Sequence, residues 1–193
     1  MFTQKHVFRA LAAFAILATL PACDSGEPDG GAGEEELISQ VTLTLTPVGG
    51  GAAETITVDF DASGTNPTFT PARLALASGT AYDGTIRLLD TFNDENITEE
   101  IEAEAEEHLF RYALSPSSAG TVTITDSESD YTSEDANGGD FAVGLQFRVT
   151  VADGASGDGE LTAILYHFDD APKPSSTATS DEIDVEVDFP VSF

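Results

Sequence analysis

The feature that most constrains this chain is a two-residue alternation of apolar and polar side chains. In segment 183–193 every odd-numbered residue is apolar, and the even-numbered residues are acids, Pro190 and Ser192. A β-strand places successive side chains on opposite faces, so this alternation predicts strands that bury one face. Pro190 cannot donate to a ladder and predicts an edge position there. Similar patterns predict strands over 37–46, 55–60, 72–76, 82–90, 109–114, 121–125, 141–151 and 160–168.

The connections and one exceptional segment complete the predicted architecture. Gly49–Gly51 predicts a hairpin turn between the first two strands. Within 96–105, Ile97 and Ile101 follow a four-residue spacing and Asn96 precedes Glu99 by three residues, which predicts a short helix. Short strands with at most one short helix predict an all-β fold, an antiparallel β-sandwich of immunoglobulin-like architecture. A membrane barrel is disfavoured because the outward faces are acidic and hydroxylated.

The first residues have the pattern of an export signal. Lys5 and Arg9 precede an apolar run of 11 residues, Ala10 to Leu20, which is too short to span a bilayer as a helix. Leu20-Pro21-Ala22-Cys23 resembles the lipobox of bacterial lipoproteins, although Pro21 departs from the usual residue at its position. We therefore predict a signal peptide over 1–22 and lipidation of Cys23, the alternative being a plain signal peptide with an incidental cysteine. Lipidation would consume the sulfur of the chain's one cysteine, which leaves no disulfide to stabilise the fold.

The charge of the chain excludes one class of partner. With 35 acidic and 7 basic residues the formal net charge is -28, and removal of Lys5 and Arg9 with the signal peptide makes it -30. Such a surface lacks the basic footprint that nucleic acid requires. Such a surface repels itself at low salt, but in about 1 M salt the Debye length falls to about 3 Å and the repulsion is screened. The composition is therefore typical of a halophilic protein. We expect a flexible acidic tether over 23–35, with Cys23 as its lipidated end, and a single domain over 36–193.

Two histidines are the sharpest candidates for chemistry. His108 and His167 each lie in or beside a predicted strand and each is next to acids, Glu106 and Glu107 in the first case. If the fold brings the strands together, the two imidazoles and the Glu106 carboxylate could bind a divalent metal such as Zn²⁺, or the imidazoles could bind haem. The alternative is a pair of ordinary half-buried histidines, because no local zinc motif is present.

A second group of acids suggests calcium. The oxygen ligands would come from Asp126, Glu128, Asp130, Asp135, Asn137 and Asp140. The glutamate that completes an EF-hand is absent, so the alternative is a long solvated loop over 126–140.

Enzymatic chemistry lacks support in the sequence. There is no Gly-x-Ser-x-Gly motif, the sole cysteine is assigned to the lipid anchor, and Gly49–Gly51 is not followed by the Lys of a phosphate-binding loop. We therefore expect no catalytic residues and a protein that is not an enzyme.

Four runs carry a resemblance to a known group. EEELISQVTLTLTP at 34–47, ITEEI at 97–101, EHLF at 107–110 and DVEV at 184–187 resemble those of small Bacteroidota lipoproteins that often carry the label "type 1 periplasmic binding fold superfamily protein". That label implies a two-lobed α/β architecture, which the absence of βαβ alternation here does not match. The resemblance implies that Asp24, Glu27 and Asp29 act as a signal for export to the cell surface. By the convention of enteric bacteria, Asp24 would instead retain the protein at the inner membrane.

Together these observations predict a membrane-anchored lipoprotein of the cell envelope, with the outer membrane favoured. Its expected role is that of a non-enzymatic accessory or binding module. The alternative is a metal- or haem-binding lipoprotein that assists an outer-membrane uptake receptor. The expected partners are the membrane, through the N-terminal lipid, and an outer-membrane protein, with no nucleic acid.

Overall fold

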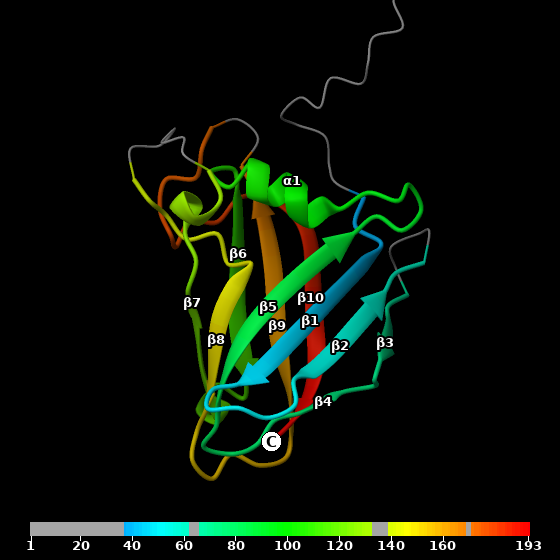
Figure 1. The fold of residues 1–193 in the computed structure, drawn as a ribbon, viewed down its shortest axis with the longest axis vertical. Helices are drawn as coiled ribbons and strands as arrows, with labels where there is room; N and C mark the ends of the chain where they lie inside the picture. Colours follow the sequence, from blue (N-terminus) through cyan, green and yellow to red (C-terminus); the bar gives the residue numbers. More distant parts are fainter. Residues whose placement is uncertain (1–36, 62–65, 133–138, 169–170) are drawn as a thin grey trace, which may run out of the picture. The chain divides into compact units, whose positions relative to one another are not determined.

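Alternating strands form two stacked sheets in the computed structural model, which describes residues 37–61, 66–132, 139–168 and 171–193 (Figure 1). The larger sheet has the order β3-β2-β1-β5-β8-β7, with β1 Gln40–Pro47, β2 Glu54–Asp59, β3 Thr68–Thr70, β5 Ala81–Leu89, β7 Gly120–Ile124 and β8 Gln146–Val151. The smaller has the order β4-β10-β9-β6, with β4 Leu74–Ala75, β6 His108–Ser115, β9 Asp158–His167 and β10 Glu182–Ser192. The predicted all-β sandwich is confirmed, although one pair, β4 with β10, is parallel. The predicted signal peptide, Cys23 and tether lie outside the described residues.

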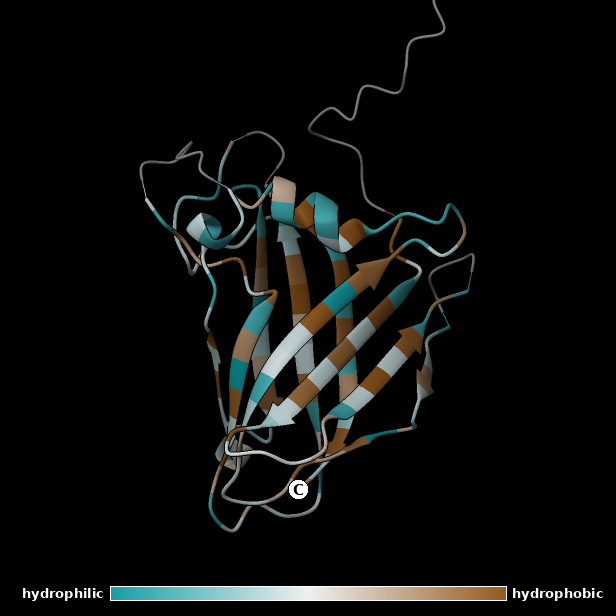
Figure 2. Cartoon of the chain, viewed as in Figure 1, coloured by the Kyte–Doolittle hydropathy of each residue, from teal (hydrophilic) through white to brown (hydrophobic). Residues whose placement is uncertain are grey.

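The core lies between the inner faces of the two sheets. In β1, Val41, Leu43 and Leu45 are fully buried, while the threonines between them lie on the outer face. Figure 2 shows the resulting alternation along β1 and β2. On the outer face the hydroxyls of Thr42 and Thr57 lie 3.0 Å apart across the β1–β2 ladder. This arrangement follows from the binary pattern of the sequence.

The predicted short helix is present as α1, Ile97–Ala103, at one end of the sandwich (Figure 1). Ile97 and Ile101 are buried, and the Thr98 hydroxyl accepts a hydrogen bond from the backbone N–H of Leu88 in β5. We call this the α1 end; β5 and β9 finish there and β6 and β10 begin there. The opposite end, which holds the β1–β2 turn at Gly49–Gly51, is the hairpin end. Two short 3-10 turns, η1 Ser117–Ala119 and η2 Glu128–Asp130, complete the described elements.

One part of the predicted alternation in β10 is wrong. The β10–β9 register shifts between Ile183 and Val185, so Asp184 is the extra residue of a β-bulge. The bulge turns the Asp184 side chain inward, where it is 2% exposed, and leaves Ile183 46% exposed. Bulges commonly redirect a side chain in this way beside functional sites. The edge expected at Pro190 agrees with the pairing, because β4 pairs only with Val191 and Ser192.

Across the described ranges, no helix is long and apolar enough to cross a membrane.

Candidate metal centre

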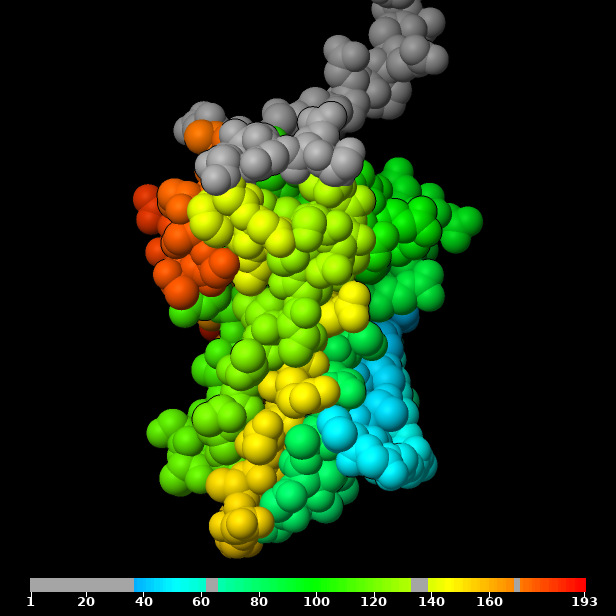
Figure 3. All heavy atoms as spheres, turned by 60° about the vertical axis from the view of Figure 1, so that its left-hand side comes forward, coloured from blue at the N-terminus to red at the C-terminus, as the bar shows by residue number. Residues whose placement is uncertain are grey.

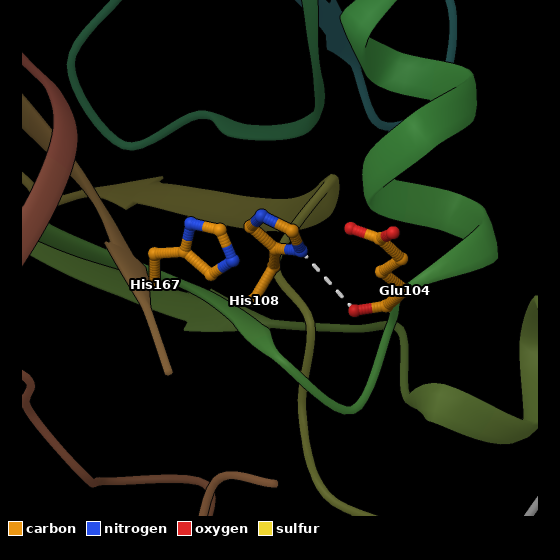
Figure 4. Close-up of side chains that lie close together, drawn as sticks. All are labelled: Glu104, His108 and His167. Carbon is orange, nitrogen blue, oxygen red and sulfur yellow. Dashed lines mark hydrogen bonds between the residues drawn. The ribbon is translucent and has the colours of Figure 1, made fainter. Parts of the chain in front are cut away.

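The site is built on two neighbouring strands: β6 begins with His108, and β9 ends with His167. His108 of β6 is paired in register with His167 of β9. The next pair along, Glu107 and Phe168, is joined by a 2.9 Å backbone hydrogen bond, so the two histidines form a pair of the non-hydrogen-bonded kind. In such a pair the Cα atoms are about 4.5 Å apart and the side chains are closest. The two imidazoles accordingly stack, with centroids 4.3 Å apart and 26° between their planes, and they are 0% and 3% exposed (Figure 4).

The turn after α1 fixes the tautomer of the first ring. Nδ1 of His108 lies 3.1 Å from the backbone oxygen of Glu104 (Figure 4). A carbonyl oxygen only accepts, so Nδ1 carries the hydrogen and, in the neutral ring, the lone pair is on Nε2. Nε2 is the nitrogen that faces Asp184.

The bulge in β10 places the Asp184 carboxylate against both rings. Its Oδ2 lies 3.8 Å from His108 Nε2, and its Oδ1 lies 3.4 Å from His167 Nδ1. Two nitrogens and a carboxylate, each from a different strand, therefore meet at the α1 end of the smaller sheet. Glu104, His108 and His167 also each offer one ligand atom, and these atoms lie within 4.8 Å of one another in a group that does not include Asp184.

These separations suit a shared metal ion. With bonds of 2.0 to 2.1 Å and tetrahedral geometry, ligand atoms around Zn²⁺ are about 3.4 Å apart. The distances of 3.4 and 3.8 Å from Asp184 to the two nitrogens are close to this value. Imidazole and carboxylate together favour Zn²⁺, Cu²⁺ or Ni²⁺ over Ca²⁺ or Mg²⁺.

Haem fits this pair poorly. Two axial imidazoles must approach the iron from opposite faces, with their nitrogens directed at one another. His108 and His167 are instead stacked nearly parallel, with their centroids 4.3 Å apart. No porphyrin can be placed between rings so close together.

The carboxylate predicted to join the two histidines is a different one. Glu106 contributes its backbone oxygen to a hydrogen bond from the Lys173 N–H, 2.8 Å away, and it is not in the cluster of ligand atoms found in the described ranges. Glu104 is the carboxylate of that cluster, and Asp184 lies against the two rings from β10. Glu104 lies one helical turn before His108, a spacing that the sequence displays but that our prediction missed. Asp184 enters only through the bulge, which alternation alone does not reveal.

The site is crowded with negative charge. Burial raises the pKa of Glu107, and the neighbouring Glu104 carboxylate raises it further. The opposing charge is that of Lys173, fully buried with its Nζ 2.7 Å from Glu128 Oε1, in an ion pair whose side chains are 0% and 4% exposed. Burial lowers the pKa of Lys173. A cation bound between His108 and Asp184 would relieve the repulsion among these carboxylates.

The acids predicted for calcium serve other contacts. Asp126 accepts hydrogen bonds from Gly144, Gln146 and Tyr131. Glu128 pairs with Lys173, while Asp130 and Asp140 accept from the serines of the same turn. Asp135 and Asn137 lie outside the described residues. Among the acids that are described, no three of the 126–140 segment bring oxygens together as an ion would need. The segment was expected to be solvated, yet Asp126 and Glu128 are buried.

Comparison of the chain with models of known families, with curated proteins and with solved structures finds no match.

Proposed function

We propose that this chain is a lipid-anchored, non-enzymatic protein of the bacterial cell envelope whose sandwich binds a divalent transition-metal ion. The proposed ligands are one nitrogen each of His108 and His167 and the Glu104 carboxylate, whose ligand atoms lie within 4.8 Å of one another, and Asp184, beside both rings, is a further candidate. The observation that carries the proposal is the bulge that turns Asp184 toward two stacked, buried imidazoles.

The separations at Asp184 are longer than direct imidazole–carboxylate hydrogen bonds. Hydrogen bonds between an imidazole and a carboxylate measure about 2.7 to 2.9 Å. The separations of 3.4 and 3.8 Å at Asp184 exceed that range and match the spacing of two ligands on one metal.

The envelope part of the proposal rests on the sequence. The basic start, the short apolar run and Leu20-Pro21-Ala22-Cys23 together support export and lipidation. The resemblance to Bacteroidota lipoproteins supports the outer membrane as the site. An exported protein that holds a metal ion in a buried site suits delivery of that ion to an outer-membrane uptake receptor.

Calorimetric titration of the metal-free protein with Zn²⁺, Cu²⁺ and Ni²⁺ in high salt tests the metal site. We expect one ion per chain for at least one of these metals. His167→Leu and Asp184→Asn should each weaken binding by about 10- to 100-fold, in line with the loss of a ligand or its support. Glu186→Gln is the matched control, because Glu186 is an exposed acid two residues further along the same strand. Flat titrations of the wild type with all three metals would refute the metal site.

The anchor is tested separately. Cells that produce the protein are grown with a labelled acyl donor, and the label should appear on the wild type and be lost in Cys23→Ser. Equal labelling of both proteins would contradict the lipid anchor and leave the metal site unaffected.

A further inference from the structure

Residues 104–108, which include Glu104 and His108, are held by hydrogen bonds to five successive backbone oxygens. The backbone oxygen of Glu104 faces the His108 ring. Each of the next four oxygens accepts a bond from the segment that follows His167: Ala105 and His108 from Lys173 Nζ, Glu106 from the Lys173 N–H, and Glu107 from the Phe168 N–H. Lys173 alone supplies three of these bonds.

The topology explains why this support is needed. β6 is an edge strand of the smaller sheet, with β9 on one side only. Because His108 and His167 form a non-hydrogen-bonded pair, the backbone oxygen of His108 points away from β9. That oxygen would face an open edge, and the Lys173 ammonium, 3.0 Å away, occupies this position. The turn between α1 and β6, which carries Glu104 and His108, therefore takes its geometry from a side chain near the other histidine.

Lys173 is in turn held from the larger sheet. Its Nζ lies 2.7 Å from Oε1 of Glu128, which belongs to η2 after β7. Glu128 Oε2 accepts a bond from the Phe141 N–H, 3.2 Å away. Figure 3 shows the segment around residue 175 packed against the segment around residue 140, where the Ala142 N–H donates to the Ser176 hydroxyl at 3.0 Å. With acceptors in Ala105, His108 and Glu128, the three donors of the ammonium are all used.

We propose that Lys173 is a positioning residue of the metal centre: by holding the carbonyls of Ala105 and His108 it sets the direction in which His108 and Glu104 present their ligand atoms. This rests on the metal site proposed above. Lys173 does not bind the ion. It links the segment from Glu104 to His108 at the start of β6 to the segment that follows His167 at the end of β9.

The test uses a double variant, because removal of one charge from a buried ion pair can prevent folding. Lys173→Met/Glu128→Leu removes both charges and keeps apolar side chains of similar size, an exchange that proteins often tolerate. It also removes the bonds from Nζ to Ala105 and His108. Ser176→Ala is the control, since it removes the neighbouring bond from the Ala142 N–H and leaves both charges and the Nζ bonds in place.

Co²⁺ serves as the probe because its visible absorption reports ligand geometry. We expect the folded double variant to bind Co²⁺ about 10- to 100-fold more weakly than the wild type, with altered absorption bands. Ser176→Ala should bind within about 3-fold of the wild type and keep its bands. A folded double variant with wild-type affinity and bands would overturn the positioning role while the metal site stands. A wild type that binds none of Co²⁺, Zn²⁺, Cu²⁺ and Ni²⁺ would overturn both.

A second measurement decides the matter if the double variant does not fold. Metal bound to the wild type should slow hydrogen exchange at the Phe168 and Lys173 amides at least 10-fold more than at the Val58 amide, which lies in the distant β1–β2 ladder. Equal slowing at all three amides would show only global stabilisation and would refute the positioning role.

Discussion

The two ends of the sandwich differ in the kind of side chain that they bury. Towards the hairpin end, the buried side chains that close the core are apolar, such as Leu45, Leu114 and Val191. At the α1 end lie the buried acids, histidines and lysine found in the described ranges: Asp90, His108, Asp126, Glu128, His167 and Lys173, together with the Asp184 side chain. Figure 1 shows that β6, β9 and β10, which carry His108, His167 and Asp184, have their ends near α1.

The two kinds of burial differ in what they contribute to the stability of the fold. Apolar burial contributes roughly 25 cal/mol per Å², and the hairpin end gains this without polar cost. Burial of an ionised group costs several kcal/mol, which even a good partner barely offsets. A chain that needed only stability could place leucine at most of these positions. Their concentration at one end therefore supports a role in binding, and substitutions at the two ends should separate stability from metal affinity.

The largest expected effect is a loss of stability from the apolar part of the core. Phe189 of β10 is fully buried and packs edge to face on Phe69, with the ring centroids 6.3 Å apart. Phe189→Ala should lower the free energy of unfolding by about 3 to 5 kcal/mol, as measured by urea denaturation. Its metal affinity, measured under conditions where it is folded, should match the wild type. A drop in affinity equal to that of His167→Leu would show that the two ends are not separable.

The opposite result is expected from His167→Leu at the α1 end. Without metal, its free energy of unfolding should fall by less than that of Phe189→Ala, because an apolar side chain of similar size fills the space and His108 still lies beside the Asp184 carboxylate. With metal at about 100 times the dissociation constant, the wild type should gain about 2.7 kcal/mol and the variant should gain nothing. Thermal unfolding with and without Zn²⁺ measures both. A metal-free variant destabilised as strongly as Phe189→Ala would make His167 a structural residue.

The hairpin end is also the part of the fold that the sequence predicts best. Alternation in β1 and β2 identifies Val41, Leu43 and Ile56 as core residues, and Gly49–Gly51 marks the turn between them. The two-residue period is a property of each strand alone, so no knowledge of the partner strand is needed. The short helix could be predicted in the same way, from the spacing of Ile97 and Ile101. Strand β3, three residues long, was missed because it shows too few alternations.

The candidate site could be predicted only in part. His108 and His167 stand out because the chain has only 3 histidines and 7 lysines and arginines, and both of these histidines are next to acids. Their direct pairing depends on the β6–β9 register, which no local pattern specifies. Asp184 depends on a bulge that reverses the face predicted for it, and Lys173 depends on the path of the chain after β9. These are long-range consequences of topology rather than of local periodicity.

The smallest effect is expected from an exposed ion pair on the larger sheet. Arg148 of β8 donates two hydrogen bonds to the Asp83 carboxylate of β5, at 2.8 and 2.6 Å, but the two side chains are 47% and 57% exposed. Solvent and salt screen such pairs, so Arg148→Met should change the free energy of unfolding by at most about 1 kcal/mol. Urea denaturation at low salt and in about 1 M salt, where the Debye length is about 3 Å, should show the small difference shrink. A loss of several kcal/mol that persists at high salt would mean that this exposed pair matters as much as a buried one, and that burial does not distinguish the charges of the α1 end.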